Sequence, residues 1–389
     1  MQISILANDP DYRNVKLSYD EEAAQNALRF HRTLPAYQET PLVSLSCAAE
    51  QYRVRSIFVK DESFRFGLNA FKGLGGSYSM FRILCDRLSL DPLNTGYTSF
   101  MNPELRERCS GIEFVTATDG NHGKGVSWAA KLFGCRAHVF MPKGTVEVRR
   151  RAIEEAGSAV AEISDGNYDQ TVAYAAFLAE KNGWILIQDT SRDGYEQIPG
   201  WIIEGYLTLG AEAISQMAGQ RPTHIFLQAG VGSMAGGLEA YFMNRFPEVR
   251  PIVTIVEPDV AACHYQSALA GDGMAHSVPG NPSTIMAGLN CGTPCSLVWP
   301  IIRDCSSFFC ACGDEVTEAG MRSYARPIGT DPTVVSGESG AVTYGLLLEI
   351  LKSDELRKQF RIDEDSVILL VSTEGNTDPE NYNRIVGER

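Results

Sequence analysis

The sequence predicts an α/β protein built on mostly parallel sheets, and three observations support this fold class. From about residue 113 onward, short apolar and β-branched stretches alternate with segments whose apolar residues recur at helical spacing. Such an order is typical of βα units, which place parallel strands between helices on both faces. Glycines follow several of the helical segments. A glycine-rich loop at 230–237 also lies between a predicted strand and a predicted helix, which is common in this class.

The first series of elements covers residues 113–187. Gly134 and Gly157 each follow a helical segment, and glycine commonly ends a helix because it adopts the left-handed conformation required there. The sequence predicts strands at 113–118, 136–141, 159–163 and 184–187, and helices at 124–133, 146–156 and 169–181.

The second series repeats this alternation. The sequence predicts helices at 202–217, 234–246, 315–325 and 341–351, and strands at 224–228, 252–256 and 367–371. The stretch 271–300 is rich in glycine and proline and has no such pattern. We expect it to form a pocket wall or a mobile loop.

Composition limits the classes of function. The chain has 389 residues, enough for two lobes, and its 44% hydrophobic and 21% charged residues are typical of a globular protein. The formal net charge of −14 argues against a nucleic-acid partner, which needs a basic surface. No apolar run approaches the ~18 residues of a membrane span, and no signal peptide is visible, so a cytoplasmic location is expected.

Cysteine spacing gives little support for a metal site. Ten cysteines are present, and the spacings of Cys291 with Cys295 and of Cys310 with Cys312 loosely resemble metal-binding pairs. Neither pair has the matching second pair that a structural zinc site needs. We therefore expect no metal.

The glycine-rich loop 230–237 suits a phosphate group. Its backbone N–H groups precede a predicted helix, whose N-terminus attracts anions. The loop nearly satisfies the dinucleotide fingerprint, and Glu257 ends the next strand 25 residues after Gly232. From this loop alone, a dinucleotide and a phosphorylated cofactor both remain open. The residues expected to cradle the phosphate are Gly230, Val231, Gly232, Ser233 and Met234.

Lys72 is the second candidate feature. It follows Phe71, and no charged residue lies within six positions on either side. Burial in such a setting disfavours the ammonium form, and a Schiff-base lysine must react as the neutral amine. The alternative is a solvated lysine at the start of a helix.

The order of five motifs resembles the fold type II (β-family) pyridoxal-phosphate enzymes, which include the serine and threonine dehydratases and the tryptophan synthase β chain. The five segments are 69–72, 119–123, 230–237, 337–341 and 372–376. The longer segments 61–72, 117–123 and 372–379 look like those of the diaminopropionate ammonia-lyases. The dehydratases usually carry a serine in place of Asp119, so this carboxylate favours a diamino substrate.

The resemblance implies a cofactor, a fold and several residue roles. Pyridoxal 5′-phosphate would be held as a Schiff base by Lys72, which would also take the α-proton of an L-substrate. Asn121 would hydrogen-bond the ring hydroxyl, unless it only caps a helix. Ser372, with Thr373 as the neighbouring alternative, would face the pyridine nitrogen. The fold would comprise two three-layer αβα domains, a large one at 1–84 and 191–389 and a small inserted one at 85–190.

Asp119 has two candidate roles in catalysis. It could take the α-proton from the face opposite Lys72, which would allow a D-substrate, or it could bind the second ammonium of the substrate. Helix capping is the structural alternative. Asp189 and Glu257 follow or end predicted strands and are candidate substrate-binding residues.

The predicted function is therefore the conversion of 2,3-diaminopropionate to pyruvate and two molecules of ammonia. A serine or threonine dehydratase of the same fold is the first alternative. A dinucleotide-dependent oxidoreductase is the alternative from another class. The resemblance further implies a homodimer.

Overall fold

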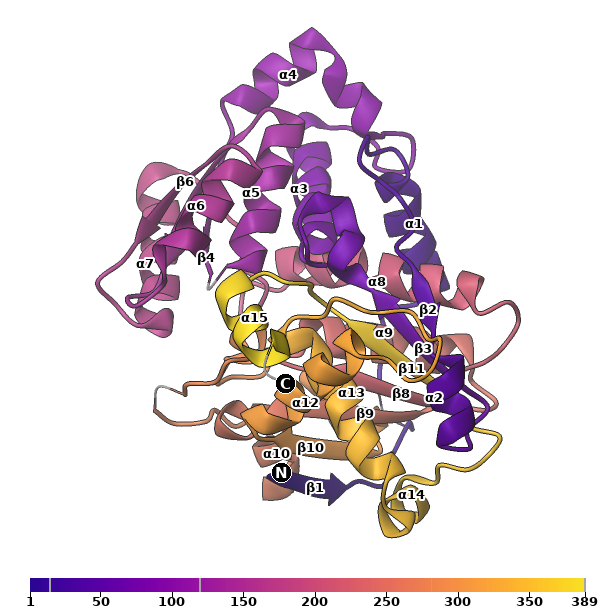
Figure 1. Cartoon of the computed structure of the whole chain (residues 1–389). Helices are drawn as coiled ribbons and strands as arrows, with labels where there is room; N and C mark the ends of the chain where they lie inside the picture. The colour runs from indigo at the N-terminus through magenta and orange to yellow at the C-terminus, as the bar shows by residue number, and fades with distance from the viewer. Residues whose placement is uncertain (14, 119, 281, 388–389) are drawn as a thin grey trace. The chain divides into compact units, whose positions relative to one another are not determined.

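The computed structural model describes residues 1–13, 15–118, 120–280 and 282–387. The chain forms two compact units (Figure 1). The larger unit comprises Met1–Glu21, Glu39–Ala70 and Leu209–Arg389, and the smaller unit comprises Glu22–Gln38 and Phe71–Thr208. The domain boundaries predicted at 84/85 and 190/191 stay a prediction.

The larger unit contains a seven-stranded sheet in which the inner strands are parallel. Its strands, in spatial order, are β1 (Ile3–Ala7), β10 (Phe308–Cys312), β9 (Ile252–Pro258), β8 (His224–Gln228), β11 (Val367–Ser372), β3 (Ser56–Asp61) and β2 (Leu42–Ser44). Only the two edge strands, β1 and β2, pair antiparallel with their neighbours. This arrangement confirms the predicted α/β class with mostly parallel strands.

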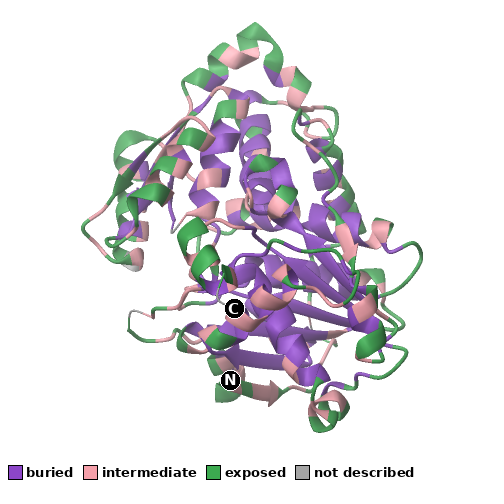
Figure 2. Cartoon of the chain, viewed as in Figure 1, coloured by how far each residue is buried: buried purple, intermediate pink, exposed green. Residues whose placement is uncertain are grey.

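Helices cover this sheet. α12 and α13 pack against each other, and α13 lies along β8 and β11, in front of the sheet in Figure 1. The strands and the inner faces of these helices are buried (Figure 2). The helices are α2 (Ser46–Gln51), α9 (Ser233–Arg245), α10 (Cys263–Ala270), α11 (Trp299–Cys305), α12 (Asp314–Ala325), α13 (Glu338–Leu351), α14 (Asp354–Phe360) and α15 (Pro379–Gly387), with 3₁₀ turns η1 (Glu62–Gly67), η3 (Asp259–Ala261) and η4 (Ala287–Leu289).

The smaller unit contains a four-stranded parallel sheet. Its strands, in spatial order, are β6 (Ala159–Ile163), β5 (Arg136–Met141), β4 (Glu113–Ala117) and β7 (Ile185–Leu186). Each predicted strand of the first series is present. The helices are α1 (Glu21–His31), α3 (Gly73–Leu88), α4 (Pro103–Ser110), α5 (Asn121–Phe133), α6 (Glu147–Ala156) and α7 (Tyr168–Asn182), with the 3₁₀ turn η2 (Tyr97–Met101); α8 (Gln197–Gln216) spans the boundary of the units.

The glycines after Lys72 form the first turn of a helix. α3 begins at Gly73, although each glycine costs a helix interior about 1 kcal/mol relative to alanine. Close packing explains this choice. A Cβ on Gly75 would lie 2.6 Å from the Tyr206 ring, and one on Gly76 would lie 3.1 Å from the backbone of Gly125. Small residues therefore let α3 approach its neighbours.

Within the described ranges, no helix combines the length and the apolar character that crossing a membrane would need.

Candidate active site

Lys72 is paired with a carboxylate in the smaller unit. It lies at the N-cap of α3, and its Nζ donates a 2.6 Å hydrogen bond to Asp189 Oδ2. The two side chains are 16% and 9% exposed, so water screens the pair only weakly. Nζ also lies 5.2 Å from the ring centre of Phe71 and 5.7 Å from that of Tyr206. Lys72 is thus held by a charge and two rings, and the solvated alternative does not describe it.

Asp189 is charged because of Lys72. Burial acts to raise the pKa of Asp189, but the nearby ammonium outweighs burial and holds this pKa well below its usual range. The pair is therefore an ion pair of carboxylate and ammonium in the free protein.

His122 lies beside Asp189 as a neutral ring. Its Nε2 is 3.0 Å from the carbonyl of Ile187, and its Nδ1 is 3.8 Å from Asp189 Oδ2. Burial lowers the pKa of His122 and outweighs the Asp189 carboxylate, which acts to raise it, and the Lys72 ammonium acts in the same direction as burial. The neutral ring therefore donates from Nε2 to the Ile187 carbonyl and packs against the ion pair.

The end of β4 positions Asp189. The backbone N–H of Ile187 donates to Val115 at 2.8 Å. The Gln188 amide then bonds both the N–H and the carbonyl of Ala117, each at 3.1 Å. Asp189 therefore leaves the sheet at the carboxyl end of its strand, where α/β proteins place ligands. Sequence reasoning had not identified Gln188, although it is a polar residue that directly follows an apolar strand.

The turn between β4 and α5 carries two further candidates. Asp119 lies outside the described residues. The Thr118 hydroxyl accepts from the N–H groups of Gly120 and Gly123 at 3.0 and 3.2 Å, which shapes the turn. Asn121 is the first residue of α5 and is half-buried.

In the larger unit, the glycine-rich loop joins β8 to α9. Gly232 has a φ of 90°, which favours glycine. A Cβ on Gly230 would lie 3.0 Å from the Gly288 carbonyl, and one on Gly232 would lie 2.4 Å from His264 Nε2. The first N–H groups of α9 have no acceptor within the helix, so Ser233 and Met234 begin a natural anion site. The loop therefore fits a phosphate group bound through backbone N–H groups.

Ser372 and Thr373 lie at the carboxyl end of β11, next to β8. The Ser372 hydroxyl donates to the Ser336 hydroxyl at 2.8 Å, and both serines are fully buried. Gln228, the last residue of β8, donates from Nε2 to the Val371 carbonyl at 2.8 Å and to the Thr373 hydroxyl at 3.1 Å. These bonds tie the two strand ends together. Sequence reasoning had not identified Ser336 or Gln228.

The position of these strands matches a known rule for ligand sites. The chain leaves β8 toward β9 on one side, whereas β11 lies on the other side of β8. Ligands of open α/β sheets bind at the carboxyl ends of strands where the order reverses in this way. The glycine-rich loop begins at this point, and Ser372 ends the neighbouring strand there.

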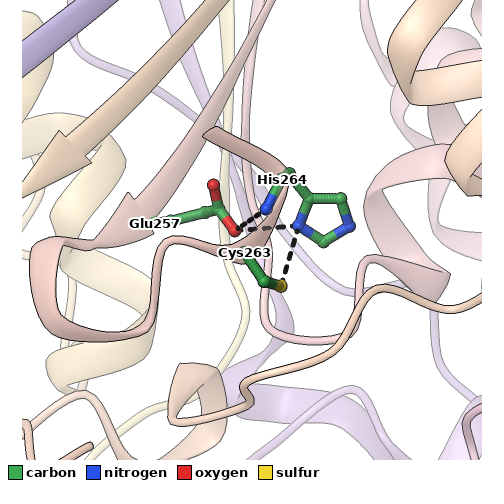
Figure 3. Close-up of side chains that lie close together, drawn as sticks. All are labelled: Glu257, Cys263 and His264. Carbon is green, nitrogen blue, oxygen red and sulfur yellow. Dashed lines mark hydrogen bonds and ion pairs between the residues drawn. The ribbon is translucent and has the colours of Figure 1, made fainter. Parts of the chain in front are cut away.

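Glu257 is fully buried at the end of β9, close to Cys263 and His264 (Figure 3). Among the described residues these three form the group whose side chains could hold a metal ion. Both Glu257 oxygens already accept N–H groups, from His264 at 2.8 and 2.9 Å and from Tyr265 at 2.7 Å. Burial raises the pKa of the Cys263 thiol, and a protonated thiol is a poor ligand. The group is therefore a hydrogen-bonded cluster.

Comparisons with known proteins cover nearly the whole chain. The family described as pyridoxal-phosphate dependent enzyme matches residues 33–374. The diaminopropionate ammonia-lyase of Salmonella typhimurium is 47% identical over 366 residues, which cover 92% of this chain and 90% of that protein. The crystal structure of the holo diaminopropionate ammonia lyase from Escherichia coli has a TM-score of 0.92 at 41% identity and covers 99% of this chain and 96% of that one. The structure of the same enzyme with an aminoacrylate-PLP azomethine reaction intermediate has a TM-score of 0.90 at 41% identity, with 99% and 97% covered.

Proposed function

The chain belongs to the pyridoxal-phosphate-dependent enzymes, and within them to the diaminopropionate ammonia-lyases, and on this basis we propose that it converts 2,3-diaminopropionate and water to pyruvate and two molecules of ammonia. This membership confirms the fold type II class and the pyridoxal 5′-phosphate cofactor that the sequence predicts. The dinucleotide alternative is set aside, because the glycine-rich loop belongs to a family with a different phosphorylated cofactor.

The ion pair of Lys72 and Asp189 is the observation that carries the proposal. A lysine that is 16% exposed and bonded to a carboxylate at 2.6 Å is held in one position by a specific partner, unlike a freely solvated surface lysine. We propose that Lys72 is the residue that binds the cofactor covalently. The rings of Phe71 and Tyr206 lie beside its Nζ, at 5.2 and 5.7 Å from their centres.

Residues of the larger unit are proposed to orient the cofactor. The backbone N–H groups of Gly230 to Met234 would bind the phosphate at the start of α9, and Gly230 and Gly232 carry no side chains there because their surroundings leave no room for a Cβ. Ser372, supported by Ser336, would face the pyridine nitrogen. A hydroxyl cannot hold a proton on that nitrogen as a carboxylate would. In the smaller unit, Asn121 would bond the ring hydroxyl.

The bound cofactor supplies the electron sink, and the side chains of this chain move the protons. We propose that the Lys72 amine takes the α-proton of an L-substrate. The charge of Asp189 favours the ammonium that results, since an opposite charge at 2.6 Å stabilises it. The same proton can then pass from Lys72 Nζ to the β-amine, which must leave as ammonia. Lys72 thus takes one proton from the α-carbon and gives the same proton to the leaving β-amine.

Asp119 keeps both of its roles as proposals. As a base on the opposite face it would extend the activity to D-diaminopropionate. As a ligand of the second ammonium it would serve both enantiomers. A serine or threonine dehydratase is the remaining alternative, and the carboxylate of Asp119 argues for the diamino substrate over a hydroxy substrate.

Formation of the 2-keto acid from four substrates tests the proposal. Purified protein supplied with pyridoxal phosphate should release pyruvate from D- or L-diaminopropionate faster than from serine, and should show little release of the 2-keto acid of threonine. A visible absorption band should be present and should vanish in Lys72→Ala. Faster turnover of serine or threonine would establish the dehydratase alternative, and a protein without a Lys72-dependent band would overturn the proposal.

The use of D-substrate has its own test. If Asp119 is the second base, Asp119→Asn should abolish turnover of D-diaminopropionate and largely retain that of the L-isomer. Equal impairment of both enantiomers would favour the role as an ammonium ligand.

We also propose a homodimer, which the family resemblance implies. Light scattering on the eluting protein should give twice the chain mass of 42.6 kDa. A mass of a single chain at micromolar concentration would contradict it.

A further inference from the structure

Gly232 of the glycine-rich loop lies against the ring of His264. His264 is fully buried, and its Nε2 would be 2.4 Å from a Cβ on Gly232. Within the described part of the chain, this Nε2 has no hydrogen-bond partner. The far edge of the ring is therefore a packing surface, and it meets the loop at the residue with the left-handed φ of 90°. Any shift of the ring changes the space available to the loop at this residue.

Glu257 fixes this ring from the other side (Figure 3). Glu257 Oε1 accepts from His264 Nδ1 at 2.8 Å and from the His264 backbone N–H at 2.9 Å. Glu257 Oε2 accepts from the Tyr265 N–H at 2.7 Å, so the carboxylate also caps the first turn of α10. Ring and helix start are thus anchored to the end of β9 by one buried charge.

Two further contacts hold the same loop from below. The Cys263 thiol donates to the Gly230 carbonyl at 3.7 Å, and because His264 Nδ1 donates to Glu257, this thiol proton is free to do so. The Cys295 backbone N–H donates to the Val231 carbonyl at 2.7 Å. The carbonyls of Gly230 and Val231 are therefore both engaged by donors of the protein.

We propose that His264, anchored by Glu257, is a positioning residue that sets the phosphate-binding loop in the conformation that holds pyridoxal phosphate. The inference rests on the proposed function, since it assigns the loop 230–234 to the cofactor phosphate. A pre-arranged loop binds without first losing conformational freedom.

Two substitutions separate the packing of the ring from its anchoring. His264→Ala removes both. His264→Asn keeps a polar group near the position of Nδ1, which can still donate to Glu257, and removes the ring edge that touches Gly232. His224→Asn is the matched control. His224 is also a buried histidine of the larger unit, bonded to the Phe360 carbonyl at 3.0 Å, and it lies at the opposite end of β8 from the loop.

The measurements are the dissociation constant of pyridoxal phosphate from the full-length protein and the ³¹P resonance of the bound phosphate. Both His264 variants should weaken binding by about tenfold to a hundredfold, which corresponds to about 1.4–2.8 kcal/mol of binding free energy, and should move the resonance toward that of the free cofactor. The control should stay within about threefold of the wild type. Melting of the apoproteins is followed in parallel, and the milder His264→Asn should melt no lower than the control.

Outcomes for the inference and for the proposed function are distinct. If the wild type has a Lys72-dependent absorption band but His264→Asn binds the cofactor as tightly as the control does, the inference alone is wrong. An equal loss of affinity in His224→Asn would also overturn it, because the effect would then be one of general stability. If the wild type lacks the band, the proposed function itself fails.

Discussion

Replacing Asp189 by asparagine removes the charge that faces Lys72 and keeps the size of the side chain. The two atoms are 2.6 Å apart, and the side chains are 16% and 9% exposed. The Asp189 carboxylate favours the ammonium that forms when Lys72 takes the α-proton, and a positioned general base contributes a factor of about 10²–10⁴ to the rate. Removing the charge weakens this base, so kcat/KM for L-diaminopropionate should fall about a hundredfold, the lower end of that range.

The assay is pyruvate release by Asp189→Asn at several pH values. Asp193→Asn is the control, since Asp193 is an exposed aspartate four residues farther along the same segment. The loss should affect kcat as well as kcat/KM, because Asp189 acts on Lys72 in the reaction and not only on substrate binding. Unfolding midpoints of both variants are measured to exclude loss of structure.

One result would refute this reasoning. If Asp189→Asn keeps kcat/KM within about threefold of the control, the ion pair does not support the proton transfer at Lys72. The same conclusion would follow if only KM rose, because Asp189 would then bind substrate without influencing the lysine.

Three further predictions concern stability and cofactor binding. Glu212→Gln should lower the free energy of unfolding, measured by urea titration, by about 3–5 kcal/mol. The reason is that Lys60 and Arg65 each contact Glu212 at 2.7 Å, and all three side chains are fully buried. A loss below about 1 kcal/mol would contradict this. Burial, with a neighbouring carboxylate, raises the pKa of Glu338 to about 7. Its contribution to the free energy of unfolding is therefore complete below pH 4.5 and is lost as the pH rises through 7. Glu338→Gln should flatten the dependence of the melting temperature on pH between 4.5 and 7. An unchanged slope would contradict this. Gly232→Ala should weaken cofactor binding at least about tenfold, since both its φ of 90° and a Cβ contact of 2.4 Å oppose a side chain, and unchanged affinity would show that the loop is not the cradle.

The local pattern of apolar residues was sufficient to predict most of the parallel strands. Strands predicted at 136–141 and 224–228 have the same bounds in the structure, because a buried parallel strand is a short apolar run that ends at polar or glycine residues. Edge strand β1 was not predicted, and it exists because β10 offers it an antiparallel partner that lies 301 to 309 residues farther along the chain, from Ala7↔Phe308 to Ile3↔Cys312. α3 was not predicted either. Its glycines have low helix propensity, and the helix forms because they allow close packing against neighbouring segments.

For the candidate site, residue types in a fixed order identified Lys72, the glycine-rich loop and Ser372. Their chemistry depends on local features: an amine in an apolar segment, backbone N–H groups at a helix start, and a hydroxyl at a strand end. The partners of these residues were decided only by the tertiary structure. Asp189 meets Lys72 across 117 residues.

Glu257 shows the same division between sequence and structure. Its place at the end of a strand can be read from the neighbouring residues in the sequence. This place made it a candidate for binding substrate, which stays a prediction. Its contacts with His264, and the packing of that ring on Gly232, depend on how α10 folds back beneath the loop. The spacing of residues along the chain determines which groups are available and which backbone conformations they favour. Which charges and rings then face one another depends on the order of the strands and on which helices cover them, because burial and charge pairing act between segments that are distant in sequence.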